Sequence, residues 1–597
     1  MVLKNFVKKQ ENCIWTGLLL LVLLFVIGCR YDYYFDLNDD VLMKDILAGI
    51  YTGAPQGHNI QMLWPVSAFI SLLYRVAGNL PCYGLFLCIC QYGSVAMVVC
   101  RSLSFCRTRW GKVLMLVTEG LLTLGLLLNQ LVCLQYTVTC TMLASAAAFL
   151  FVTTDIELSA KEFIKKNTGV ILLVILAFLI RSEMLLLVTP LICVAGVMKW
   201  GSEKVIFTKE HAVKYLAVIG GIVVGLGLSM VCHNLAYGSD EWKKFTEYFD
   251  NRTELYDFQV LPEYEPHKDF YEGIGLAESE RELLDNYNFG LSEEIDEKIV
   301  GQVAEYAAQN RSAEKPLTER LLTAFGNYYR RTVYGPEHNE SDFPWNRIII
   351  LAYVAVFATA IPDKEKNLIV RLFQIVWKLG FLGVIRSVLW IWLISRDRVP
   401  PRISVSMYMM EFCILIGMLL VQIQKLRREE ADAKNQKIWP LLIGALFAFY
   451  GVAVLLPSFT KTDADVEVKA ENNICYNALY SYLSQKENRK NFYFIDVYSS
   501  VAYTEKVFEN VDNSLDNYDI MGGWACKSPI WKEKLATFAI DNMQEAFISR
   551  EDVFYVQRTG KDTTWLYQYY KDQGIKIQME PMEEPIEDFE IYRICGE

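Results

Sequence analysis

The stretch CIWTGLLLLVLLFVIGC (residues 13–29) contains no charged side chain and follows Lys4, Lys8 and Lys9. A membrane-spanning helix needs about 20 apolar residues, and lysines before such a run favour a cytoplasmic start. No small-residue cleavage site follows the run, and the chain continues directly into Arg30-Tyr-Asp-Tyr-Tyr. A secretory signal peptide would end at such a site, so this stretch predicts a retained first span with its N-terminus in the cytoplasm.

Further apolar runs bring the prediction to about 11 spans of the required length. The additional runs lie at 82–100, 113–131, 136–153, 169–181, 183–198, 213–236, 347–361, 368–394, 403–424 and 438–456. Two of them, 169–181 and 183–198, are short and join at Arg181-Ser-Glu183. Their length indicates two half-inserted helices that meet at a polar point.

The composition supports this class of protein. The 597-residue chain is 53% hydrophobic and 21% charged, with the apolar residues gathered in blocks, which excludes a disordered chain and a single large soluble enzyme. Its net charge of −11 argues against a nucleic-acid binder, which needs a basic face. The 15 cysteines and five histidines show no metal-ligand or disulfide spacing.

The distribution of basic residues predicts the orientation of the chain. Lysine and arginine cluster at 101–112, 161–166, 199–214 and 425–437, all cytoplasmic if the N-terminus is cytoplasmic. The outer side then holds 30–80, 237–345, 395–402 and 457–597. Segment 237–345 contains 24 acidic and 11 basic residues, which suits an outer loop. We therefore expect a multi-pass protein of the cytoplasmic membrane with its N-terminus inside and its C-terminus outside.

Two parts of different character are predicted. Residues 1–456 form the transmembrane domain, with the outer loop 30–80 and the outer helical loop 237–345. Residues 457–597 form an extracytoplasmic α/β domain, because helix-like and strand-like patterns alternate there. The expected strands lie at 491–498, 552–557, 575–579 and 589–595, and the expected helices at 473–484 and 564–572.

The first outer loop carries the densest polar cluster beside a span, Asp36-Leu-Asn38-Asp39-Asp40. One interpretation is that Asn38 caps a helix and that Asp39 and Asp40 lie favourably in its first turn. The other is that one carboxylate is a general base, because partial desolvation at the membrane surface raises its basicity. Its neighbour would then bind a divalent cation or orient an acceptor. The two interpretations are compatible.

This loop resembles that of the membrane-embedded C-type (GT-C) glycosyltransferases, nearest the protein O-mannosyltransferase and aminoarabinose transferase type. An acidic pair after the first span is followed by a helix ending at Gly49, and then by His58 before an apolar run. The family carries an Asp-Glu pair and a His-Pro-Pro segment here. In this chain the pair is Asp39-Asp40, and Asn59-Ile60 follow the histidine.

Two later segments add to the resemblance. Residues 176–190 (LAFLIRSEMLLLVTP) are similar to the family's apolar–Lys-Gly–apolar–Pro segment, with Arg181 where lysine is usual. Residues 396–402 (RDRVPPR) are similar to the family's Arg-Tyr-x-x-Pro entry into a late helix, with Ile403 in place of the tyrosine. The resemblance covers roughly residues 10–425.

The resemblance implies an enzyme that moves a sugar from a polyprenyl-phosphate-linked donor to an envelope glycan, glycolipid or protein on the outer face of the membrane. Arginines at outer helix ends would offset the charge that develops on the donor phosphate. The expected roles are general base for Asp39, support or metal binding for Asp40, phosphate binding for Arg181, Arg402 and Arg396, and substrate positioning for His58, Glu183 and Asp36. The metal would be a divalent cation such as Mg or Mn.

Other functions remain open at this point. Arginines at span ends also snorkel to the interface without a chemical role. A non-enzymatic transporter or flippase of lipid-linked saccharides would contain the same kinds of polar residue. A membrane anchor that presents the C-terminal domain needs only one span, so the many apolar runs argue against it.

Overall fold

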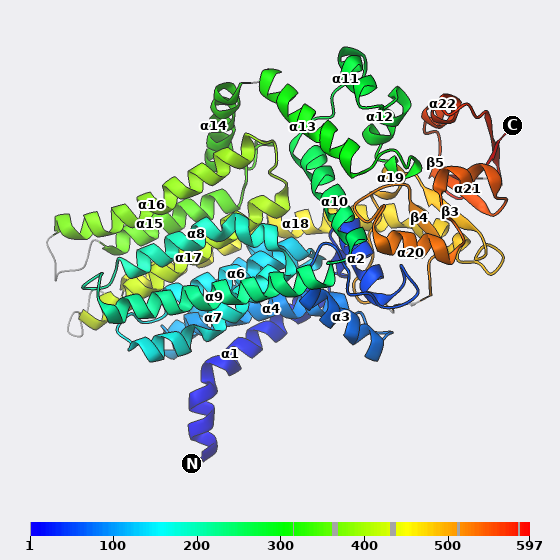
Figure 1. Cartoon of the computed structure of the whole chain (residues 1–597). Coiled ribbons are helices and arrows are strands. Elements are labelled where there is room, and N and C mark those ends of the chain that lie inside the picture. Colours follow the sequence, from blue (N-terminus) through cyan, green and yellow to red (C-terminus); the bar gives the residue numbers. More distant parts are fainter. Residues whose placement is uncertain are drawn as a thin grey trace.

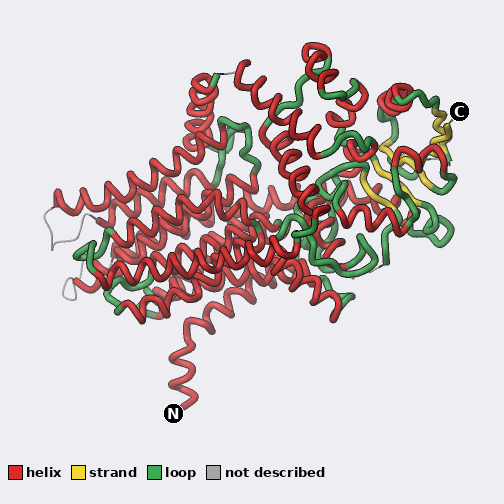
Figure 2. The backbone as a smooth tube through the Cα atoms, in the orientation of Figure 1, coloured by secondary structure: helices red, strands yellow, loops and turns green. Residues whose placement is uncertain are grey.

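The computed structural model describes residues 2–314, 316–360, 368–429, 438–509, 511, 514–582 and 585–596. Helices form most of it, and the longer strands gather near the C-terminus (Figure 2). Within these residues, ten helices are long and apolar enough to cross a membrane, and one shorter apolar helix accompanies them. This agrees with the predicted polytopic helical membrane protein.

The long apolar helices lie side by side in one half of the molecule (Figure 1). They are α1 (Val2–Gly28), α4 (Cys82–Leu103), α5 (Arg109–Val132), α6 (Tyr136–Thr153), α7 (Ala160–Ile180), α8 (Ser182–Trp200), α9 (Lys209–Ala236), α16 (Leu368–Ile394), α17 (Pro401–Glu429) and α18 (Ile438–Leu483), with the shorter α15 (Trp345–Ala360) beside them. Helix α6 is the most buried of these, because α4, α7 and α17 pack around it.

The prediction of two half-inserted helices around Arg181 is wrong. Helices α7 and α8 contain 21 and 19 residues, and each is long enough to span by itself. The apolar run left out the polar first turns of α7, which begins at Ala160 with the Ser159 hydroxyl accepting a hydrogen bond from the backbone of Glu162. Arg181 therefore lies in the turn between two full helices.

The loop 30–80, which is predicted to lie outside, is compact. Strand β1 (Tyr34–Phe35) pairs in parallel with β2 (Cys133–Leu134), and helices α2 (Asn38–Ala48) and α3 (Trp64–Val76) follow β1. The prediction that Asn38 caps α2 is wrong, because the cap position is Leu37 and no side chain caps the helix. Helix α2 ends at Gly49, whose φ of 89° favours glycine, since a Cβ there would also lie 2.6 Å from the backbone of Ala54.

The segment 237–345, which is predicted to be an outer helical loop, is helical. It contains α10 (Asp240–Phe258), η1 (Glu265–His267), α11 (Lys268–Gly273), α12 (Glu278–Asp285), η2 (Phe289–Leu291), α13 (Glu297–Glu314) and α14 (Leu317–Val333). The aromatic side chains Trp242, Phe245 and Tyr248 on α10 are buried, so they form a packed face.

The C-terminal part contains a five-stranded mixed sheet in the order β4-β3-β5-β7-β6. Its strands are β3 (Phe492–Ile495), β4 (Tyr518–Ile520), β5 (Val553–Arg558), β6 (Ile577–Pro581) and β7 (Phe589–Gly596), and its helices are α19 (Val497–Ser500), α20 (Pro529–Thr537), α21 (Met543–Ser549) and α22 (Thr564–Asp572). The four predicted strands and the helix 564–572 are confirmed. Strand β4 escaped the prediction because it has only three residues.

Helix α18 joins the two parts of the chain. It has 46 residues, which corresponds to a length of about 70 Å, and it runs without a break through residues 456 and 457. Its last turns bury Tyr476, Leu479 and Leu483 against the sheet residues Tyr493 and Ile495. The predicted helix 473–484 is thus the end of the last spanning helix, and the sheet is packed directly on that helix.

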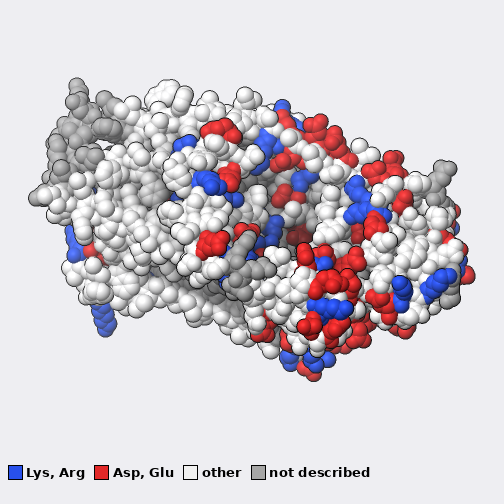
Figure 3. Space-filling view, turned by 90° about the horizontal axis from the view of Figure 1, so that it is seen from above, with Lys and Arg blue, Asp and Glu red and all other residues white. Residues whose placement is uncertain are grey.

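The surface reflects this arrangement. In the view of Figure 3, lysine, arginine, aspartate and glutamate gather over the half that carries the outer helices and the sheet, whereas the other half is largely uncharged. Exposed apolar side chains such as Val223, Leu228 and Leu235 on α9 cover the long helices. This contrast is expected when one half of a protein lies in lipid and the other in water.

Candidate active site

The acidic cluster is held in place by the short strand pair. The backbone N–H of Asp36 donates to the carbonyl of Leu134 (2.8 Å), which extends the pairing of β1 with β2. Helix α2 begins two residues later, so Asp39 and Asp40 lie in its first turn. The partial positive charge of a helix N-terminus stabilises carboxylates at this position.

Asp40 is fully buried and ties three helices together. Its Oδ1 accepts hydrogen bonds from the hydroxyl of Tyr83 on α4 (2.8 Å) and from the backbone N–H of Tyr136 at the start of α6 (3.3 Å). Its Oδ2 has no hydrogen-bond partner in the described part of the chain. Burial raises the pKa of Asp40 well above the usual value for an aspartate. The geometry suits a positioning residue.

Asp39 is half-buried and faces the C-terminal part of the chain. Its Oδ1 accepts a hydrogen bond from Trp524 Nε1 (3.1 Å). Trp524 belongs to the segment Gly522-Gly-Trp-Ala-Cys526, where a Cβ on Gly522 would lie 1.8 Å from the carbonyl oxygen of Tyr287 and Gly523 adopts a φ of 90°. The two glycines therefore allow the close approach that brings Trp524 to Asp39.

Arg181 lies in the turn between α7 and α8. Its Nη1 donates to Gln61 Oε1, its Nε pairs with Glu183 (3.1 Å), and its guanidinium lies over the ring of Tyr136 (5.2 Å to the centroid). Burial favours the uncharged form of the guanidinium, but its interactions with Tyr136 and with the carboxylates of Glu183 and Asp39 outweigh burial and raise the pKa of Arg181. The side chain is therefore a fixed cation within electrostatic range of Asp39.

Arg402 is the second residue of α17 and is half-buried. It makes no hydrogen bond or ion pair with any residue that the structure describes. Its guanidinium lies within electrostatic range of Tyr136. Tyr136 thus has Arg181 over its ring and the charges of Arg402, Asp39 and Asp40 around it. Of the predicted site residues, Arg181 and Asp40 contact Tyr136 directly, and Asp39 and Arg402 lie within electrostatic range of it.

The other predicted site residues have different partners. Arg396 lies between the rings of Phe258 (5.3 Å) and Trp392 (5.0 Å). His58 stacks on Trp242 (5.1 Å) and hydrogen-bonds the carbonyl of Ala236 through Nε2 (3.2 Å). These contacts attach both side chains to α10, and they also attach Arg396 to α16 and His58 to α9.

Asp36 and Glu183 flank the cluster. Asp36 pairs with Lys469 on α18 (3.5 Å), which also donates to the Asp36 carbonyl (2.6 Å). Glu183 is 67% exposed and reaches the cluster only through its ion pair with Arg181. Asp36 therefore ties the loop to α18, whereas Glu183 orients Arg181.

The predicted metal site is not supported by the geometry. The described residues contain no group of three or more histidine, cysteine, aspartate or glutamate side chains arranged to hold a metal ion. Of the pair Asp39 and Asp40, the second is buried and accepts a hydrogen bond from Tyr83. Only Asp39 offers a carboxylate to a ligand here, and one carboxylate is a weak site for a divalent cation.

Sequence reasoning missed four side chains of this cluster, Gln61, Tyr83, Tyr136 and Trp524. Tyr136 and Tyr83 each lie in the first turn of a spanning helix, at the predicted outer end, where tyrosine usually signals an interface anchor. Trp524 follows two consecutive glycines, Gly522 and Gly523, and this pair was the signal in the sequence that could have drawn attention to it.

Comparison with protein-family models, with curated proteins and with solved structures found no match to this chain.

A buried ionic network joins α2 to the C-terminal part. Lys44 pairs with Asp45 (2.7 Å) and with Glu505 (2.5 Å), and Tyr51 donates to Asp519 (2.8 Å). Burial and the neighbouring carboxylate of Asp45 raise the pKa of Asp516 at this interface to about 7. Burial beside other carboxylates likewise raises the pKa of Asp45, to about 6.

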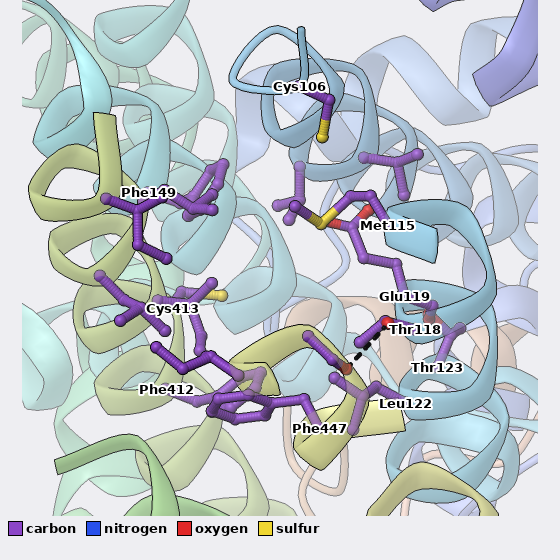
Figure 4. Close-up of a pocket in the computed structure, with 18 of the residues that line it drawn as sticks. Cys106, Met115, Thr118, Glu119, Leu122, Thr123, Phe149, Phe412, Cys413 and Phe447 are labelled. Carbon is purple, nitrogen blue, oxygen red and sulfur yellow. Dashed lines mark hydrogen bonds between the residues drawn. The ribbon is translucent and has the colours of Figure 1, made fainter. Parts of the chain in front are cut away.

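A separate, largely apolar cavity of about 680 Å³ lies inside the helix bundle. Figure 4 shows Thr118 and Glu119 of α5 on one wall and Phe149, Phe412 and Cys413 on the opposite wall. The Thr118 hydroxyl donates to the Gly444 carbonyl (3.4 Å), but Glu119 Oε2 is buried without a hydrogen-bond partner in the described residues.

The network of α2 and the C-terminal part predicts a pH-dependent stability. Because the folded-state pKa of Asp516 is raised, the native chain binds more protons than the unfolded chain between about pH 4 and pH 7, so stability falls as pH rises through that window. We expect Asp516→Asn to remove on the order of 1–2 kcal/mol of this loss. Thermal unfolding at pH 5 and pH 8 measures it, with Asp541→Asn, an exposed site, as control. An unchanged pH dependence in Asp516→Asn would contradict the assignment.

The unpaired oxygen in the bundle predicts a stabilising substitution. A buried polar atom without a partner costs roughly 1–3 kcal/mol, so Glu119→Leu should raise the unfolding temperature in detergent. Glu119→Gln is the matched control, because it keeps the volume and leaves a polar amide in the cavity, and it should gain less. A lower unfolding temperature for Glu119→Leu would mean that the carboxyl group has a stabilising partner.

Proposed function

We propose that this chain is a membrane glycosyltransferase, which moves a sugar from a polyprenyl-phosphate-linked donor to a glycan, glycolipid or protein acceptor at the outer face of the cytoplasmic membrane. The observation that carries the proposal is the cluster around Tyr136. It combines a half-buried carboxylate, Asp39, with two arginines at helix ends, Arg181 and Arg402. The resemblance of these segments to the GT-C glycosyltransferases supports the same reaction.

The arginines suit the leaving group. Transfer breaks the bond between the anomeric carbon and the phosphate oxygen, and the electron pair of that bond stays on the phosphate. Two guanidinium groups stabilise this charge most effectively where water is excluded. Arg181 is held by Gln61, Glu183 and Tyr136, so it needs little reorganisation, whereas Arg402 keeps its donors for a ligand.

Asp39 suits the acceptor. Trp524 occupies only its Oδ1, and Oδ2 makes no hydrogen bond to another described residue. In the proposed reaction Oδ2 takes the proton of the acceptor hydroxyl while that oxygen attacks the anomeric carbon. Asp40 acts through α2, whose position it fixes with Tyr83 and Tyr136. No step requires the metal, and the residues present do not form a site for it.

A transporter of lipid-linked saccharides is the second candidate. The apolar cavity inside the bundle favours it, because a carrier needs a path for hydrocarbon chains. The two functions differ in their dependence on Asp39. Transport depends on many polar contacts along a path, whereas general-base catalysis depends on one group.

The enzyme hypothesis predicts that Asp39→Asn abolishes most of the transfer. The amide retains the size of the side chain and still accepts a hydrogen bond from Trp524, but it takes no proton, so the rate should fall by about 10²- to 10⁴-fold. The measurement is sugar transfer in membranes from a panel of radiolabelled polyprenyl-phosphate sugars, with protein amounts matched.

Asp32→Asn is the control for this experiment, because Asp32 lies in the same loop and forms an exposed pair with Lys506 (2.9 Å). It should leave transfer within a few-fold of wild type. Equal transfer by Asp39→Asn and wild type would remove Asp39 as the base. If folded wild-type protein transfers no sugar from any donor in the panel, the transporter becomes the better hypothesis.

The phosphate-binding role predicts a different kinetic effect for Arg402→Gln. Loss of one charged donor at the leaving group should lower kcat/KM for the donor by roughly 10²-fold, with a smaller effect on the KM for the acceptor. Arg30→Gln is the matched control, because Arg30 pairs with Asp463 on an exposed surface (2.6 Å). A change confined to acceptor KM would place Arg402 beside the acceptor.

A further inference from the structure

A second cavity, of about 620 Å³, lies among the outer helices and is lined mainly by polar side chains. Four segments form its walls: the loop after α10, helix α13, helix α14, and the turn after α16. The lining includes Glu263, His267, Asn310, Glu319, Arg320 and Asn327. Figure 3 looks onto the side of the molecule that carries α13 and α14, and it shows a hollow bordered by acidic and basic side chains between the uncharged and charged halves.

Helix α14 separates this cavity from the apolar surroundings of the bundle. Glu319, Arg320, Thr323 and Asn327 recur at helical spacing and line the cavity. Elsewhere on the same helix, Leu322, Phe325 and Tyr329 are 75%, 62% and 56% exposed.

The orientation of α14 explains its exposed apolar side chains. The helix runs across the direction of the long helices in Figure 1, and Tyr328 on it hydrogen-bonds Ser387 on α16 (2.9 Å). An amphipathic helix with this orientation, beside the end of a spanning helix, lies in the membrane interface with its apolar side chains in lipid. The cavity on its other side therefore adjoins the head-group layer.

The cavity offers hydrogen-bond donors and acceptors together. Arg320 Nε is buried without a hydrogen-bond partner in the described residues, and neither Glu263 nor Glu319 forms an ion pair with any of them. Arg311 is already paired with Asp397 (2.9 Å). Two carboxylates beside one available guanidinium disfavour an anion, and the charged lining disfavours a hydrocarbon chain. A hydroxyl group both donates and accepts, so a ligand with many hydroxyls matches this lining.

We propose that this cavity binds a neutral saccharide, and that the saccharide is the acceptor of the transfer reaction. The turn after α16 connects this cavity with the candidate active site. Asp397 lies in that turn, with a φ of 55°, and lines the cavity. Arg402 of the candidate active site follows five residues later. The binding site is inferred from the cavity itself, and its role as acceptor site rests on the proposed function. The saccharide comes either from a glycolipid in the outer leaflet or from a soluble glycan.

Hydrogen exchange of the full chain in phosphatidylcholine nanodiscs tests the binding site without turnover. One arm adds monoglucosyl diacylglycerol to the nanodisc, and the other adds soluble maltose. We expect peptides covering 260–267 and 317–327 to exchange at least several-fold more slowly in one arm, which also identifies the source. Arg320→Gln and Asn327→Ala should reduce this protection about tenfold at equal ligand concentration.

Lys298→Gln is the control, because Lys298 is exposed on α13, one of the helices that form the cavity, and does not line it. It should retain full protection. Absence of protection in both arms, or equal protection in wild type and Arg320→Gln, would overturn the site. This experiment measures binding and does not require transfer. If the wild-type protein shows protection but transfers no sugar, the proposed function is contradicted and the binding site stands.

Discussion

The buried carboxyl group of Asp40 fixes the position of the candidate active site. It accepts hydrogen bonds from Tyr83 and from the backbone of Tyr136, and so joins the start of α2 to α4 and α6. Asp39 precedes it on the same helical turn, so its place follows from that of Asp40. A buried acid is expensive unless it is hydrogen-bonded, which makes this junction intolerant of other arrangements. Asp40 contributes by geometry, and Asp39 remains available for chemistry.

The cluster is complete only when the C-terminal part is docked on α2. Trp524 donates to Asp39 from 485 residues further along the chain, and Lys44 at the same interface pairs with Glu505. Helix α18 makes this docking rigid, because it continues from the bundle into the sheet without a break. The C-terminal part therefore contributes directly to the environment of the candidate base.

Local patterns in the sequence predicted what local physics determines. Apolar runs predicted the long helices, and strand-like patterns predicted four of the five strands of the C-terminal sheet. Arg181 was identified because it lies between two apolar runs. The short strand β4, the polar first turns of α7 and the contact of Trp524 with Asp39 depend on partners distant in sequence. A single sequence records no such pairing, so the prediction did not include Tyr136, although the guanidinium of Arg181 lies over its ring.

The restraint on Asp39 bears on the choice between catalysis and transport. A transport path needs side chains that exchange partners as the cargo moves, which favours mobile, multiply hydrated groups. General-base catalysis instead needs a carboxylate held within hydrogen-bond reach of one hydroxyl. One oxygen of Asp39 is held by an indole N–H, its backbone begins a helix anchored by Asp40, and Arg181 is fixed by three neighbours. A site with so little freedom is better suited to one reaction geometry than to a moving cargo.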